Sequence, residues 1–202
     1  MAQRRGSGRR EEIAGVAAEM FARKGFRGTG MTEIAARVGI TEPGLLYHFR
    51  NKEGLLRAVI EWRDSRSMDY AREVTSIGGL GTIREMPAYA HRNRAERGLT
   101  KLFAVLLAEN LDEGDPAHAF FRDRYREMRA LLADALAVGQ ERGEIRADIV
   151  PARKAAEILA TLDGLATQWL LDPDEVDLVD AIESYARSLE SDLAAVGTPL
   201  GR

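Results

Sequence analysis

The residues with the clearest chemical potential are hydrogen-bond donors grouped between positions 29 and 52. They are Thr29, Gly30, Thr32, Tyr47, His48 and Lys52. The first three stand where a predicted helix begins, and the free N–H groups at a helix start attract anions. The phenol, the imidazole and the ammonium can each donate a hydrogen bond to a phosphate oxygen. The grouping therefore indicates a surface that holds a phosphate backbone.

A second set of residues can meet the edges of nucleic-acid bases. The set comprises Thr41, Glu42, Pro43 and Gly44. Thr41 can donate or accept a hydrogen bond, Glu42 can accept one from the N4 amine of cytosine, and Pro43 can contact a thymine methyl group. Because these contacts are few, we expect sequence selectivity to depend on DNA shape and on the spacing of two bound heads.

Each of these residues also has an ordinary structural explanation. Thr29 and Thr32 could cap a helix, and Tyr47 could be half-buried packing. His48 and Lys52 could be solvated surface groups. Their joint placement around one short helix favours binding to DNA over these alternatives.

Helices must position these residues, because apolar side chains recur at helical spacing along the chain and strand signals are nearly absent. Glycine, proline and cap residues divide the pattern into about nine helices. The first ends at Gly25, and the others span about 31–38, 41–49, 52–72, 83–96, 99–112, 117–142, 152–171 and 176–195. The glycine-rich segment 77–81 is expected to be a loop or hinge. The fold class is all-α, with a helix-turn-helix domain over 1–58 and a regulatory and dimerisation domain over 59–202.

The composition supports the same division. Residues 1–60 hold 11 Lys or Arg and 6 Asp or Glu, whereas the remainder holds 18 and 26, so a basic head precedes an acidic body. Four arginines could form a flexible basic arm for DNA: Arg4, Arg5, Arg9 and Arg10. Cysteine is absent, which excludes disulfides and thiolate metal sites. No apolar run approaches the roughly 18–20 residues that span a membrane, and we expect a cytoplasmic protein without a membrane partner.

The stretch from about residue 10 to 58 resembles the DNA-binding domain of the tetracycline-repressor (TetR) family of bacterial regulators. The matching residues are Phe21, Gly25-Phe26, Thr29, Thr32, Ile34-Ala35, Val38-Gly39-Ile40-Thr41, Leu45, Tyr47-His48-Phe49, Lys52-Glu53 and Leu55-Leu56. The resemblance implies an all-α homodimer, a palindromic operator in double-stranded DNA, and repression relieved by a small ligand. Two positions depart from the family: Leu46 replaces a frequent tyrosine, and Gly44 replaces a frequent Ala, Ser or Thr.

The resemblance also assigns the last two helices to a dimer interface, and their apolar stripes are wide enough to supply one. The expected interface residues are Leu162, Leu165, Trp169, Val179, Ile182, Tyr185 and Leu189. A partly apolar effector is expected in a pocket among the fourth to eighth expected helices. The candidate lining residues are Met68, Met86, Tyr89, Phe103, Leu107, Phe120, Phe121, Tyr125, Met128 and Trp169.

The leading hypothesis is a dimeric, sequence-specific transcriptional repressor that a small molecule releases from its operator. A DNA-binding regulator without an effector is the first alternative, and a helical interaction module or enzyme is the second. No catalytic group, cofactor or metal is expected. Gly78-Gly79-Leu80-Gly81 lacks the lysine and the strand context of a phosphate loop, and His91 and His118 form no metal constellation.

Overall fold

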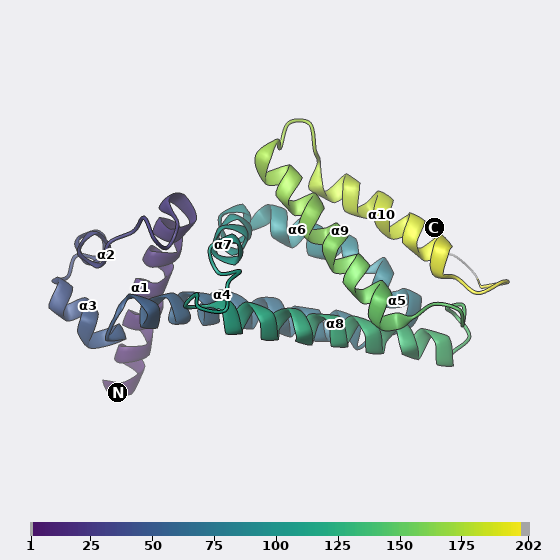
Figure 1. Ribbon diagram of the computed structural model, residues 1–202, viewed down its shortest axis with the longest axis horizontal. Helices are drawn as coiled ribbons and strands as arrows, with labels where there is room; N and C mark the ends of the chain where they lie inside the picture. Colours follow the sequence, from purple (N-terminus) through teal and green to yellow (C-terminus); the bar gives the residue numbers. More distant parts are fainter. Residues whose placement is uncertain (1, 199–202) are drawn as a thin grey trace. The chain divides into compact units, whose positions relative to one another are not determined.

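Helices make up most of the described backbone. The computed structural model describes the backbone of residues 2–198 and the side chains of residues 8–198 other than 65 and 66 (Figure 1). The helices are α1 (Ala2–Lys24), α2 (Met31–Val38), α3 (Glu42–Phe49), α4 (Lys52–Thr75), α5 (Gly79–Arg84), α6 (Met86–Ala95), α7 (Arg97–Ala108), α8 (His118–Glu141), α9 (Pro151–Leu171) and α10 (Leu178–Leu193). An isolated antiparallel bridge joins Ile145 and Ala194. The fold is all-α, as the apolar periodicity predicts.

The expected helices are present, with one difference in the middle of the chain. The single helix expected over 83–96 is two helices, because α5 occupies part of the segment expected as a loop and Glu85 separates it from α6. Pro87 lies in the first turn of α6, where the missing N–H of a proline costs no helical hydrogen bond. Periodicity alone did not reveal this break, because apolar residues continue across it.

Two compact units divide the chain. The first comprises residues 1–67 and 98–122, and the second comprises 68–97 and 123–202. The first has a core that includes Phe21, Leu56 and Leu106, and the second has a core that includes Leu136 and Ile158, all at most 2% exposed. Because residues 98–122 belong to the first unit, each unit is built from two separate segments of the chain. The functional boundary near residue 58 stays a prediction.

The Gly78–Gly79 turn is a packed joint of the second unit, and α5 begins at Gly79 within the segment expected as a loop or hinge. Both glycines have positive φ, 72° and 59°. A Cβ on Gly79 would lie 2.0 Å from Oε2 of Glu144, and one on Gly78 would lie 2.7 Å from Cγ1 of Val138. The same Glu144 oxygen accepts a hydrogen bond from the N–H of Leu80 at 3.2 Å. The turn is therefore held by close contacts.

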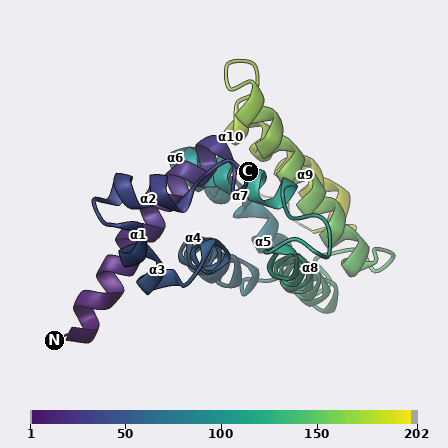
Figure 2. The same cartoon turned by 60° about the vertical axis from the view of Figure 1, so that its left-hand side comes forward.

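The last two helices lie side by side within the second unit (Figures 1 and 2). Asp177 caps α10 through its carboxylate, which accepts hydrogen bonds from the N–H groups of Val179 at 2.8 Å and Asp180 at 3.1 Å. These N–H groups lower the pKa of the Asp177 carboxyl. At the opposite end of α10, Glu190 accepts two hydrogen bonds from the guanidinium of Arg84 on α5, at 2.6 and 2.8 Å.

Candidate nucleic-acid interface

A tight turn joins α2 to α3. Gly39 ends α2 in the left-handed conformation, with φ of 78°, and its N–H donates to the carbonyl of Ala36 at 3.2 Å. Thr41 then begins α3, because its hydroxyl oxygen accepts a hydrogen bond from the N–H of Gly44 at 3.3 Å. Pro43 lies in the first turn of α3. These residues are the turn chemistry of a helix-turn-helix.

One face of each short helix is buried, and the other is open. Ile34 on α2 and Leu45 and Phe49 on α3 are at most 4% exposed and belong to the core of the first unit. Tyr47, on the opposite face of α3, is 86% exposed. Thr41 and Pro43 are exposed as well, so α3 presents the base-reading residues expected from the sequence on an open surface.

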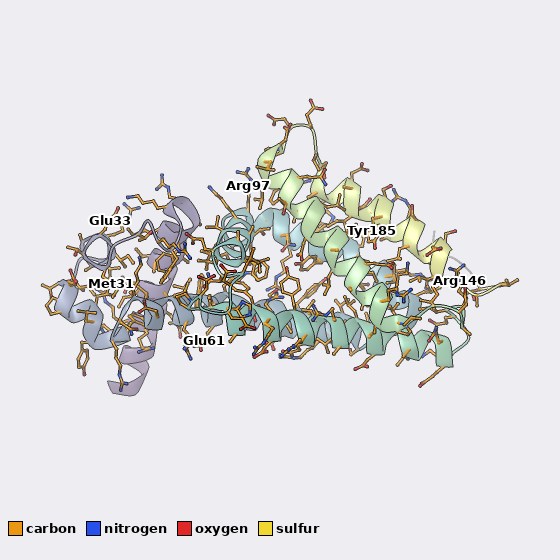
Figure 3. The ribbon with its side chains drawn as sticks, in the orientation of Figure 1. Met31, Glu33, Glu61, Arg97, Arg146 and Tyr185 are labelled. Carbon is orange, nitrogen blue, oxygen red and sulfur yellow. The ribbon has the colours of Figure 1, made fainter. Side chains whose placement is uncertain are left out.

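The start of α2 lies on the same surface. Gly30 is its N-cap in an extended conformation and supplies no side chain to the first N–H groups. Met31 and Glu33 mark this first turn in Figure 3. The hydroxyl of Thr32 donates a hydrogen bond to the carboxylate of Glu42, which links the first turns of α2 and α3. Thr32 and Glu42 therefore hold each other in place, a pairing that the sequence did not reveal.

Thr29 is a structural residue, which corrects its expected place among the phosphate contacts. Its side chain is 1% exposed, and its hydroxyl donates to the carbonyl of Gly25 at 2.8 Å. A hydroxyl that is buried and bonded to a carbonyl has no path to a phosphate. Thr29 instead fixes the turn between α1 and α2.

Lys52 and His48 surround the end of α3. The ammonium of Lys52 lies 4.6 Å from the ring centre of Phe26 and 3.5 Å from the carbonyl oxygen of Arg27. The imidazole of His48 packs edge-on against Tyr47, with 5.6 Å between ring centres. An ammonium has three donors, so Lys52 can hold this turn and still offer hydrogen bonds to a phosphate.

The basic N-terminus is not a flexible arm, because its backbone is helical from Ala2 onward. Arg10 donates to the carbonyl of His48 and lies 4.6 Å from the ring centre of Phe49. Arg9 donates to the carbonyl of Val38 at 3.4 Å. Both arginines thus cap the carboxyl ends of α3 and α2, where a positive charge is favourable. The side chains of Arg4 and Arg5 lie outside the described residues.

Some of the expected effector residues line a small cavity, and the others stay predictions. A cavity of the first unit is lined by Ile60, Arg63, Asp64, Leu102, Phe103, Leu106, Phe120 and Phe121. Three expected residues line it (Phe103, Phe120 and Phe121), and Leu107 packs against the same core. Six others belong to the second unit: Met68, Met86, Tyr89, Tyr125, Met128 and Trp169. Sequence reasoning missed Arg63 and Asp64, which border this cavity although the surface that faces it is apolar.

Tyr125 has a clear polar partner in the second unit. Its hydroxyl donates to the carboxylate of Asp163 on α9 at 2.6 Å. Burial first, and then the negative charge of Asp163, raise the pKa of the Tyr125 phenol above its ordinary value.

The expected dimer residues divide into two groups. Four are at most 7% exposed in the core of the second unit: Trp169, Val179, Ile182 and Leu189. Because their side chains are already covered, they leave almost no area for a partner, and their assignment to an interface is corrected. Three are half-buried: Leu162, Leu165 and Tyr185, the last of which is labelled on α10 in Figure 3.

The described part of the chain offers neither a metal-binding cluster nor a membrane-spanning helix. Among the side chains of residues 8–198, apart from 65 and 66, no group of His, Asp and Glu could hold a metal ion. Over the described part of the chain, no helix combines the length and the apolar character needed to cross a membrane.

Comparison with known proteins decides the family. Residues 13–59 match the family described as bacterial regulatory proteins, tetR family. Residues 88–194, more than half of the chain, match the C-terminal part of BetI-type transcriptional repressors. The chain belongs to the TetR family. Its helix-turn-helix is therefore the DNA-binding domain of a transcriptional regulator, and the family is regulatory rather than enzymatic.

Individual TetR-family relatives span most of the chain. The transcriptional regulator TtgR of Pseudomonas putida is 26% identical over 186 residues, which cover 87% of both chains. The repressor KstR2 of Mycobacterium tuberculosis is 31% identical over 149 residues, which cover 70% of this chain and 71% of KstR2.

Solved TetR-family structures have the same fold. The structure of SmeT, the repressor of a Stenotrophomonas maltophilia multidrug efflux pump, aligns with a TM-score of 0.80 at 20% identity, over 96% of this chain and 94% of SmeT. FadR of Bacillus subtilis, in complex with stearoyl-CoA, aligns with a TM-score of 0.77 at 18% identity, over 90% of this chain and 98% of FadR.

Proposed function

We propose that this TetR-family protein is a cytoplasmic homodimeric repressor, which binds a palindromic operator and is released by a partly apolar small molecule. The observation that carries the proposal is the open face of α3. Tyr47 is 86% exposed there, while Leu45 and Phe49 on the other face are buried. An exposed aromatic side chain adds little to the stability of the fold. A phenol at the end of a recognition helix can donate a hydrogen bond to a phosphate oxygen.

The proposed contacts with DNA divide by chemistry. Gly30 offers open backbone N–H groups at the start of α2, and Tyr47, His48 and Lys52 offer side-chain donors to phosphates. Four residues at the start of α3 face the bases, namely Thr41, Glu42, Pro43 and Gly44, with Glu42 held by Thr32. Since few of them can read bases, spacing of half-sites and DNA shape carry much of the specificity.

The proposed dimer uses α9 and α10. Leu162, Leu165 and Tyr185 are half-buried in the monomer, so they keep apolar area for a second copy. Sedimentation of the purified protein tests this directly, because a dimer has twice the mass of one chain. Monomeric protein at concentrations that saturate DNA would contradict the proposed dimer.

We place the effector in the first unit between α4, α7 and the start of α8, where the cavity is only about 10 Å³ and must widen to admit a ligand. The surface that faces the cavity is apolar, and Phe103, Phe120 and Phe121 suit an apolar ligand. Ligand complexes of structural neighbours support a small-molecule effector, although their titles do not place its site: SmeT has a solved complex with triclosan, and FadR has one with stearoyl-CoA.

The decisive experiment measures DNA binding. Duplexes selected by the wild-type protein from a random pool, and duplexes from the region around its own gene, are titrated by fluorescence anisotropy at several salt concentrations. We expect sequence-dependent and salt-dependent binding. Tyr47→Ala and Lys52→Ala should weaken it, whereas Lys101→Ala, which removes an exposed lysine from α7, should not. Binding that ignores sequence, or equal losses in all three variants, would refute the proposal.

The alternative of a regulator without an effector is separated by ligand screening. A compound that raises the melting temperature and also lowers operator affinity supports the effector. Substitution of Phe121 by Ala should weaken the response to that compound. A screen in which every stabilising compound leaves operator affinity unchanged would favour the alternative.

A further inference from the structure

Glu109, directly after α7, holds the turn between α1 and α2. Its carboxylate accepts a hydrogen bond from the N–H of Phe26 at 2.7 Å and a longer one from the N–H of Arg27 at 3.5 Å. These N–H groups follow Gly25, where α1 has ended, so they have no place in the hydrogen bonding of that helix. A single side chain, 83 residues away in sequence, therefore satisfies the turn.

Gly25 allows this carboxylate to approach. Its φ of 76° is in the left-handed region, and its N–H donates to the carbonyl of Phe21 at 2.9 Å. A Cβ at Gly25 would lie 2.6 Å from Oε1 of Glu109, closer than two such atoms can come. The turn and the carboxylate fit because position 25 has no side chain.

Glu109 lies in a segment that is itself firmly held, the corner of residues 109–117 between α7 and α8. Asn110 is 2% exposed, and its amide donates to the carbonyl of Leu106 at 2.7 Å and accepts from the N–H of Ala117 at 2.8 Å. Asn110 thus ties the end of α7 to the start of α8. A carboxylate on such a support can fix the position of what it binds.

A second contact joins the same corner to the same turn. The guanidinium of Arg27 pairs with the carboxylate of Asp115 at 3.0 Å, and the Asp115 side chain is 14% exposed. The other oxygen of Asp115 accepts a hydrogen bond from the N–H of Asp112 at 3.0 Å. The turn that leads into α2 is therefore held by two acids of this corner, Glu109 and Asp115.

We propose that Glu109 is a positioning residue for DNA binding: from the corner of residues 109–117 it fixes the α1–α2 turn, and through it the orientation of α2 and α3. The inference rests on the proposed function of α3 as the recognition helix. Glu109 itself touches no DNA. Without its carboxylate, the N–H groups of Phe26 and Arg27 must find water, and the start of α2 loses its fixed position.

The test compares three variants on the operator duplex that the wild-type protein selects. Glu109→Ala removes the acceptor, and Glu109→Gln keeps an amide oxygen that can still accept from Phe26. Glu113→Ala removes an equal charge from an exposed position in the same corner. We expect about tenfold weaker binding for Glu109→Ala, a loss of less than about threefold for Glu109→Gln, and wild-type affinity for Glu113→Ala.

Two further readouts separate positioning from general stability. Hydrogen exchange should show lost protection at the amides of Phe26 and Arg27 in Glu109→Ala, while amides of the α7 interior stay protected. On duplexes whose half-sites are moved apart by single base pairs, Glu109→Ala should discriminate less between spacings than wild type. A structural role alone would lower affinity equally at all spacings.

Distinct results would overturn distinct claims. If the wild-type protein selects no DNA sequence, both the proposed function and the inference about Glu109 are wrong. If the wild type binds and Glu109→Ala binds equally well, the proposed function stands and the inference fails. The inference also fails if Glu113→Ala loses as much affinity as Glu109→Ala, because charge would then explain the effect.

Discussion

Substitution of Gly79 by Ala tests whether the turn before α5 is a packed joint. The matched control is Gly143→Ala. Both glycines have positive φ, 59° and 71°, so both substitutions place an alanine in the left-handed region. A Cβ on Gly79 meets Glu144 at 2.0 Å, whereas nothing lies within 4 Å of a Cβ on Gly143. The pair therefore separates close packing from backbone strain.

The magnitude follows from these contacts. The left-handed conformation costs alanine about 1–2 kcal/mol at either site. At position 79 the carboxylate of Glu144 must also move, which deprives the buried N–H of Leu80 of its acceptor. An unsatisfied buried N–H costs about 1–3 kcal/mol. We therefore expect Gly79→Ala to be about 2 kcal/mol less stable than Gly143→Ala.

Thermal unfolding followed by circular dichroism measures this difference. For a chain of this length, about 2 kcal/mol corresponds to a melting temperature lower by about 6 °C. Operator affinity should remain the same in both variants at low temperature. Equal melting temperatures would refute the reasoning, because a flexible hinge tolerates a methyl group as readily as the open site at position 143 does.

Three further predictions concern single contacts. Ile182→Ala should destabilise the protein by about 2–5 kcal/mol in denaturant unfolding, because Ile182 is fully buried; unchanged stability with weakened dimerisation would restore it to an interface. Arg10→Ala should lower the free energy of unfolding by about 1 kcal/mol in the same assay, because it removes the hydrogen bond to the carbonyl of His48. A free energy equal to that of the wild type would show that this hydrogen bond does not stabilise the fold. Tyr125→Phe removes a phenol whose pKa is raised in the folded state. In the wild type, the contribution of this phenol to folding stability is complete below the unfolded pKa of about 10 and declines at higher pH. The stability of wild type should therefore fall more steeply than that of Tyr125→Phe above about pH 10, and parallel curves would contradict the assigned pairing with Asp163.

Local sequence patterns were sufficient for the helix-turn-helix. Leu45 and Phe49 are four residues apart on the predicted recognition helix and Ile34 is an apolar residue of the helix before it, and the structure buries all three. Thr41 is a favourable N-cap by residue type, and its hydroxyl oxygen does accept from the N–H of Gly44. These signals lie within a few residues of the contacts that they predict.

Contacts that depend on the path of the chain could not be predicted in this way. A threonine at position 29 can contact a phosphate or form an internal hydrogen bond. The turn at Gly25 brings a carbonyl within reach of its hydroxyl, and the internal hydrogen bond forms. An apolar stripe that contains Ile182 indicates burial without saying whether the chain itself or a second copy covers it. Glu109 sits at an ordinary helix end, and nothing near it in sequence indicates a partner 83 residues earlier.

The hydrogen bonds of Arg9 and Arg10 bear on how the protein should respond to salt. A regulator releases condensed counterions from DNA in proportion to the phosphates that it contacts, with a slope of about −0.9 per phosphate. The first 60 residues hold 11 basic side chains, but Arg9 and Arg10 donate to carbonyls at helix ends, Lys24 pairs with Glu33, and Arg27 pairs with Asp115. Several basic side chains of the first 60 residues therefore bond to groups within the protein itself. The ionic-strength dependence of operator binding should follow the few donors around α3, and be far shallower than the basic composition suggests.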